Sequence, residues 1–149
     1  MAETTNPALT EIAFLEGNWA MTVSNASFMP DPADTMTGKA SFQCREQGAF
    51  LVMYMGDPDA GAPDATWLIS RDDANAEYKV LYYDNRQVSR VYKMSYSEGV
   101  WKMWRSSPDF SQRFSAELSE DRQTIRGQWE KSNNGKVWEH DFDVVYTRI

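Results

Sequence analysis

Short segments in which apolar and polar side chains alternate fill the sequence from residue 18 onward, and this pattern most restricts the possible fold. In the segment 36–45, for example, Phe42 and Cys44 alternate with Ser41 and Gln43. A period of two places successive side chains on opposite faces, so each segment predicts a half-buried β-strand. The strands expected on this basis are 18–24, 36–45, 50–55, 66–71, 78–83, 88–96, 100–105, 110–118, 124–131 and 137–148.

Turn-forming residues separate these strands at short intervals. Asp84-Asn85-Arg86, Ser97-Glu98-Gly99 and the run 133–136 are typical turns, whereas only 25–34 and 56–64 leave room for longer loops. A parallel crossover needs a dozen or more residues, so connections this short make neighbouring strands antiparallel.

Ten antiparallel strands in chain order need a second sheet to pack on, or closure into a barrel. Closure removes unpaired edges, and a barrel of about eight to ten strands has room for one small ligand. We therefore expect an all-β, up-and-down barrel forming a single domain over 1–149, with a two-sheet sandwich as the alternative. Asn6, Pro7 and Gly17 mark the start and stop of a short helix that would close one end.

Composition excludes several classes of site and partner. The only cysteine is Cys44 and the only histidine is His140, so neither an internal disulfide nor a zinc site with several such ligands is possible. The net charge of −7 without a basic cluster argues against nucleic acid as a partner. Neither a membrane-spanning run nor a secretory signal is visible, so we expect a cytoplasmic protein. We also expect that it needs no metal or cofactor.

The last hairpin can be aligned from its turn at Asn134-Gly135. This alignment places Trp129 opposite His140 and Gly127 opposite Phe142, with His140 and Phe142 on the inward face. Four roles for His140 stay open: a neutral core histidine, a hydrogen-bonding group for a ligand, a haem ligand, or a catalytic base.

A second polar residue is expected inside the barrel. Val88, Arg90, Tyr92 and Met94 share the more apolar face of their strand, which would carry Arg90 inward. A buried guanidinium needs a partner, either a tyrosine hydroxyl such as that of Tyr82 or an anionic group on a ligand. The alternative is that Arg90 lies outside or is paired within the protein.

The segment 50–55 carries large apolar side chains on both faces. If its even-numbered residues face inward, an apolar stripe of Leu51, Met53 and Met55 faces outward. Such a stripe would form the interface of a homodimer or be covered by the N-terminal helix.

Several motifs resemble those of lipocalins and related calycin barrels. They are a short helix followed by Gly17-Asn18-Trp19, a last strand that ends in Arg148, the Tyr82-Tyr83-Asp84 turn, and Gly-x-Trp-Glu at 127–130. In this order they look like a small, mostly uncharacterised bacterial lipocalin-like family. The resemblance implies that Arg148 packs over Trp19 and seals the narrow end, a structural role.

The same resemblance implies a cavity for a small hydrophobic or aromatic molecule, which would be an acid if Arg90 contacts it. The residues expected to line it are Trp67, Tyr82, Arg90, Tyr92, Trp101, Phe114, Trp129, His140 and Phe142. One alternative is a small enzyme of the isomerase, cyclase or decarboxylase type, with His140 as base. Another follows from nitrobindins, whose final strand carries an axial haem ligand at a place comparable to His140, although their Gly-rich extension of the first Trp motif is missing here. A third is a barrel filled by its own aromatic side chains that associates through its outer surface.

Overall fold

The computed structural model describes residues 7–31, 33–56 and 61–149, and its ten strands close into one antiparallel barrel. A 3-10 helix, η1 (Pro7–Leu15), precedes the strands, and a shorter one, η2 (Glu46–Gly48), joins β2 to β3. The strands are β1 (Gly17–Ser24), β2 (Met36–Arg45), β3 (Phe50–Met55), β4 (Ala65–Asp72), β5 (Glu77–Asp84), β6 (Ser89–Ser97), β7 (Val100–Arg105), β8 (Ser111–Leu118), β9 (Thr124–Ser132) and β10 (Glu139–Arg148).

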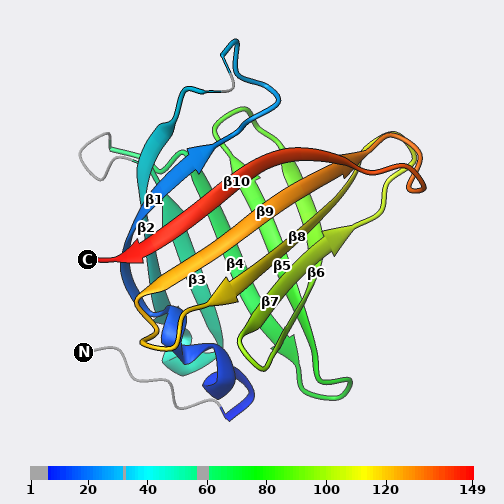
Figure 1. Cartoon of the computed structure of the whole chain (residues 1–149). Helices are drawn as coiled ribbons and strands as arrows, with labels where there is room; N and C mark the ends of the chain where they lie inside the picture. Colours follow the sequence, from blue (N-terminus) through cyan, green and yellow to red (C-terminus); the bar gives the residue numbers. More distant parts are fainter. Residues whose placement is uncertain (1–6, 32, 57–60) are drawn as a thin grey trace.

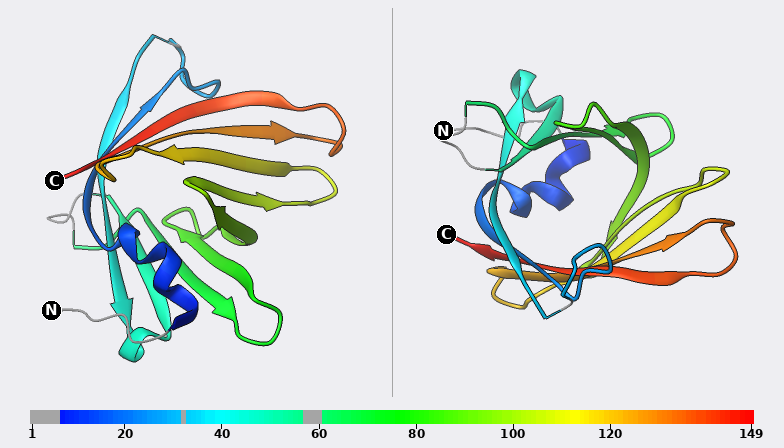
Figure 2. Two further views of the ribbon diagram at one scale, coloured as in Figure 1. Left: turned by 60° about the horizontal axis from the view of Figure 1, so that its bottom comes forward. Right: turned by 90° about the horizontal axis from the view of Figure 1, so that it is seen from above.

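Each strand pairs with its neighbours in the chain, and β10 pairs with β1 to complete the circle (Figure 1). Viewed from above, the strands form a ring with η1 across its far end (Figure 2). The expected up-and-down barrel is confirmed, and the sandwich is wrong. No helix of the described residues combines the length and apolar character needed to cross a membrane.

Helix η1 closes one end of the barrel with its apolar side chains. Leu9, Ile12 and Leu15 are fully buried, and the indole Nε1 of Trp19 donates a hydrogen bond to the Leu15 carbonyl at 2.9 Å. The Arg148 guanidinium lies 4.2 Å from the centre of the Trp19 ring. The packing of Arg148 over Trp19 is therefore as expected, and the expected short helix is a 3-10 helix.

Arg148 also ties η1 to the last strand by hydrogen bonds. Its Nη1 donates to the Glu16 carbonyl at 2.9 Å, and its Nη2 donates to the Phe14 carbonyl. These carbonyls lie at the end of η1, where the helix itself supplies no donors. One guanidinium thus satisfies the helix terminus and covers the indole.

The expected orientation of β3 is wrong. Leu51 and Met53 are fully buried inside the barrel, and Tyr54 is exposed on the outer face. The odd-numbered and the even-numbered side chains of β3 are both apolar, so alternation could not show which set faces inward. Met53 lies opposite the buried Trp67 on β4, and this pairing shows that the odd-numbered set does. The stripe of odd-numbered residues is not at the surface, and the homodimer stays a prediction.

The expected alignment of β10 is also wrong, by two residues. Phe142 lies opposite Trp129, and the register shifts between His140 and Phe142, which leaves Asp141 without a partner in the ladder. The backbone N–H of Ser27 donates a hydrogen bond to the Asp141 carbonyl at 2.7 Å, and the Ser27 hydroxyl donates to the Asp141 carboxylate, also at 2.7 Å. This contact with the β1–β2 connection holds the extra residue in place.

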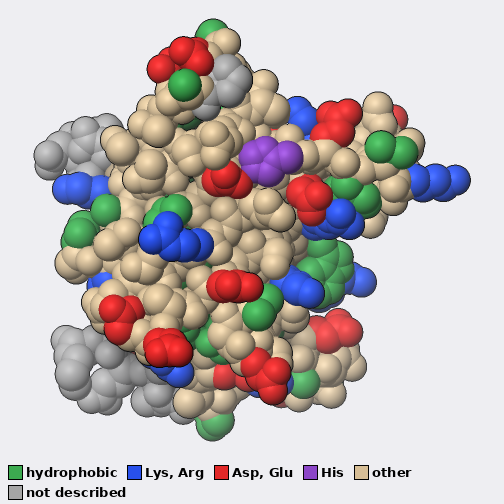
Figure 3. All heavy atoms as spheres, viewed as in Figure 1, with side chains coloured by type: hydrophobic (Ala, Val, Ile, Leu, Met, Phe, Trp, Pro, Cys, Tyr) green, Lys and Arg blue, Asp and Glu red, His purple; other side chains and the backbone are tan. Residues whose placement is uncertain are grey.

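As a result His140 points out of the barrel rather than into it. Its side chain is 41% exposed, and its Nε2 lies 2.8 Å from Oδ1 of Asp143. The one histidine of the sequence is visible on the outer surface in Figure 3. The expected inward His140 is therefore wrong.

Candidate functional site

The structure brings the seven predicted Trp, Tyr and Phe lining residues together in one cluster inside the barrel. From Trp67 the contacts run to Tyr82, Tyr92, Trp129 and Phe142, with successive ring centres 6.4, 6.1, 5.7 and 6.2 Å apart. Most of these pairs meet edge-on or tilted, as aromatic pairs prefer. The contacts link strands β4, β5, β6, β9 and β10.

A second series of contacts completes the cluster. Trp101 lies 6.4 Å from Trp67 and 5.0 Å from Phe114, and Phe114 lies 5.0 Å from Trp129. The indole Nε1 atoms of Trp67 and Trp101 are buried and find no hydrogen-bond partner among the described residues. A buried donor without an acceptor costs about 1–3 kcal/mol, so both indoles lower the stability of this part of the barrel.

The cluster comes nearest to the surface at the end of the barrel opposite η1, which we call the distal end. There Tyr82 and Phe142 are half-buried, whereas the members deeper in the barrel are buried. Phe28, from the β1–β2 connection, is 57% exposed and meets Phe142 edge-on at 5.6 Å. A ring can therefore rest against the cluster from this side.

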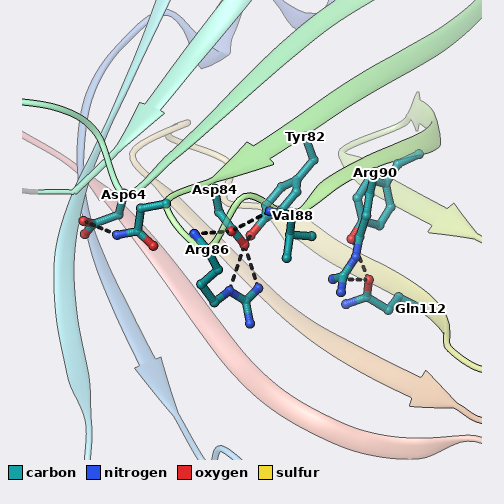
Figure 4. A network of polar contacts seen from close by, with 9 residues as sticks. Asp64, Tyr82, Asp84, Arg86, Val88, Arg90 and Gln112 are labelled. Carbon is teal, nitrogen blue, oxygen red and sulfur yellow. Dashed lines mark hydrogen bonds and ion pairs between the residues drawn. The ribbon is translucent and has the colours of Figure 1, made fainter.

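Arg90 reaches the interior at the distal end, as expected from its strand. Its Nη1 donates a hydrogen bond to Oε1 of Gln112 at 3.3 Å, and the Tyr92 hydroxyl donates to the same oxygen at 2.6 Å (Figure 4). Gln112, on β8, is only 8% exposed. The partner of Arg90 is thus an amide that the sequence interpretation did not name.

Local strand pairing explains why Gln112 bridges these two residues. β6 pairs with β7 only from Lys93 opposite Trp104 to Ser97 opposite Val100, so residues 89–92 of β6 have no ladder partner on that side. The two hydrogen bonds to Gln112 cross this gap from β6 to β8. Side-chain contacts therefore replace backbone pairing at the distal end.

Asp84 organises the turn after β5 at the same end. Its Oδ2 accepts hydrogen bonds from the Tyr82 hydroxyl at 2.7 Å and from Nη2 of Arg86 at 2.6 Å, and its side chain is only 5% exposed (Figure 4). The Arg86 hydrogen bond is the largest cause holding the pKa of Asp84 well below its usual range. Burial and the hydrogen bond to Asp84 raise the pKa of Tyr82 to about 12.

Arg105 is a site residue that the sequence interpretation missed. It follows the buried Trp101 and Met103 at alternate positions of β7 and lies opposite Gln112 in the ladder. Its Nη1 donates to the Phe110 carbonyl at 3.3 Å, and its buried Nε has no hydrogen-bond partner among the described residues. The alternation along β7 was the signal that could have revealed it.

The arginines at the distal end differ in their partners. Asp84 pairs with Arg86, but within the described residues neither Arg90 nor Arg105 takes part in any ion pair. Tyr92 lies within electrostatic reach of Arg90, Arg105 and Asp84, although burial is the main cause that raises its pKa. In the described part of a protein of net charge −7, two guanidinium groups thus lack a carboxylate partner.

Two surface hollows lie away from this cluster. One, of about 700 Å³, lies beside β1, β2 and β3 and is lined by residues such as Lys39 and Tyr54. The other, of about 450 Å³, lies near η1 between Arg71 and Tyr96. Neither is lined by a predicted lining residue. In the described part of the chain, no three Cys, His, Asp or Glu side chains are grouped to bind a metal ion.

The fold is a closed ten-strand antiparallel up-and-down barrel with an aromatic interior. Among solved structures, the protein Rv2717c from M. tuberculosis has the same fold, with a TM-score of 0.58 over 97% of this chain and 98% of that one. The two sequences are 12% identical, so the similarity extends to the fold alone. No protein-family profile matches the sequence, and no curated protein is similar to it.

Proposed function

We propose that the protein binds a small aromatic or apolar molecule at the distal end of the barrel. The observation that carries this proposal is the connected aromatic cluster, which reaches the surface at the half-buried rings of Tyr82 and Phe142. A ligand ring would pack on these two rings in the edge-on manner that Phe28 already shows against Phe142. Phe28 would then move aside or pack on the ligand.

Binding is favoured over catalysis by the state of the titratable groups. A proton-transfer group works best when its pKa lies near the working pH. Here the pKa of Asp84 lies well below its usual range because of its hydrogen bond with Arg86, and that of Tyr82 is raised to about 12. His140, the base of the enzyme alternative and the ligand of the haem alternative, is outside the barrel. Neither alternative is therefore proposed.

Calorimetric titration with neutral aromatic probes tests the proposal. We expect β-naphthol or indole to bind the parent protein saturably, with one molecule per chain. Tyr82→Ala should weaken binding by about tenfold, the effect of losing one aromatic contact worth about 1.4 kcal/mol. Tyr82→Phe keeps the ring and should bind like the parent.

The neighbouring residue supplies the matched control. Tyr83 is adjacent in β5 but lies on the outer face, where it is 42% exposed. Tyr83→Ala should leave the affinity for naphthol unchanged. Failure of every neutral probe to bind, or an equal loss of affinity in the Tyr82→Ala and Tyr83→Ala variants, would overturn the proposal.

A further inference from the structure

We propose that Arg90 and Arg105 form an anion site at the distal end, and that the ligand of the aromatic cluster is an aromatic carboxylic acid whose carboxylate enters it. This inference rests on the proposed function and names the chemical class of its ligand. It adds Arg105 and Gln112 to the residues that recognise the ligand.

Strand register and one hydrogen bond place both arginines beside Gln112. Arg105 and Gln112 lie opposite each other on β7 and β8, so their side chains share one face. Gln112 is buried, and its Oε1 accepts the hydrogen bond from Arg90. Gln112 therefore has Arg105 beside it on one strand and Arg90 in contact from another.

The site offers hydrogen-bond donors in excess of acceptors. The Oε1 of Gln112 is occupied by Tyr92 and Arg90, while its Nε2 donates to none of the described residues. The Nε of Arg105 is buried and also lacks an acceptor. A guanidinium carries five N–H donors and no acceptor, so the group that fits here is one that only accepts hydrogen bonds.

Charge leads to the same chemical class. Asp84, at the same end of the barrel, already accepts hydrogen bonds from Arg86 and Tyr82. Arg90 and Arg105 are half-buried, and within the described residues neither forms an ion pair. Keeping a partly desolvated charge without a partner is costly, whereas a bound anion would compensate both guanidinium groups.

The neighbouring rings determine what the anion is attached to. The Arg90 guanidinium lies 5.2 Å from the centre of the Phe110 ring, and the Tyr92 hydroxyl that shares its amide partner belongs to the aromatic cluster. An anion beside Arg90 is thus close to Tyr92, whose ring packs 5.7 Å from that of Trp129. In an aromatic carboxylic acid the carboxylate is attached directly to the ring. The carboxylate would bind the guanidinium groups, whose geometry it matches, while the ring packs on the aromatic cluster.

Three probes of the same ring system test this inference by calorimetry: β-naphthoate, β-naphthol and β-naphthyl phosphate. We expect naphthoate to bind the parent at least about tenfold more tightly than naphthol, the size of effect that a charge-assisted hydrogen bond supplies. Its affinity should fall as sodium chloride is raised, and that of naphthol should not. Tighter binding of the phosphate than of naphthoate would overturn the assignment to a carboxylic acid.

Variants of the two arginines locate the anion. Arg105→Gln and Arg90→Gln should each remove the preference for naphthoate and keep the affinity for naphthol. Arg126→Gln is the matched control, because Arg126 is exposed on β9; it should behave like the parent. Circular dichroism checks folding, and Arg105→Lys, which keeps the charge, should retain part of the preference if Arg105→Gln does not fold.

The outcomes separate this inference from the proposed function. If naphthol binds and naphthoate binds no more tightly, the anion site is wrong and the aromatic site stands. If neither probe binds, the proposed function itself fails. Equal loss of the naphthoate preference in the Arg126→Gln control would also refute the assignment to Arg90 and Arg105.

Discussion

Replacing Arg148 tests how the helix end of the barrel is held closed. Its guanidinium lies 4.2 Å from the centre of the Trp19 ring and donates hydrogen bonds to the carbonyls of Glu16 and Phe14. Loss of the cation–π contact costs about 1 kcal/mol, and loss of two charged hydrogen bonds costs about 1.5 kcal/mol each. We therefore expect Arg148→Ala to lower the free energy of unfolding by about 4 kcal/mol.

Urea unfolding followed by circular dichroism measures this change. The dependence of the free energy on urea should stay the same, because the surface exposed on unfolding is unchanged. Arg126→Ala, a substitution of an exposed arginine on β9, should change stability by less than about 0.5 kcal/mol. Arg148→Lys keeps the charge but loses the planar guanidinium with its several donors, so its loss of stability should lie between those of Arg148→Ala and Arg126→Ala. An Arg148→Ala protein within about 1 kcal/mol of the parent would refute this account of the barrel closure.

Three further predictions follow from other contacts. A Cβ at Gly127 would lie 2.7 Å from a neighbouring side-chain carbon, so Gly127→Ala should destabilise by about 2 kcal/mol. Thermal unfolding measures this loss of stability. In the same measurement Gly38→Ala, whose added Cβ would lie 3.5 Å from its nearest contact, should lower the stability much less. His140→Ala should leave the naphthol affinity unchanged in calorimetry, and a loss of affinity would contradict its outward position. The hydrogen bond from Arg86 lowers the pKa of Asp84 in the folded protein. The ionised Asp84 therefore stabilises the fold above pH about 4, and this stabilisation is lost as the pH falls through the lowered pKa. Asp84→Asn should therefore cost about 2 kcal/mol near neutral pH, and its difference from the parent in urea unfolding should narrow below pH about 4.

The strands and their order were predictable because their signals are local. Alternation in β2 and the short turn before β6 depend only on adjacent residues, and hairpins of this kind leave few topologies open. The same local logic placed Arg90 on the inward face with Tyr92 and Met94.

The errors arose where long-range contacts decide. The extra residue at Asp141 is held by Ser27, which is far away in the sequence, and it reverses the facing of His140. In β3 both faces are apolar, so the inward face is fixed by pairing with Trp67 rather than by alternation. Arg105 was missed although its alternation was readable, because a charged residue at a strand end is usually taken to be exposed.

The closure of the sheet between β1 and β10 also determines when the barrel can form. Trp19 pairs with Arg148, which lies 129 positions later in the chain. During synthesis β1 is made before the nine later strands. The edge of β1 that pairs with β10 therefore stays unpaired until the last strand is made. Contacts this distant in sequence make folding slow. The growing chain thus carries an unpaired strand edge until β10 has been made.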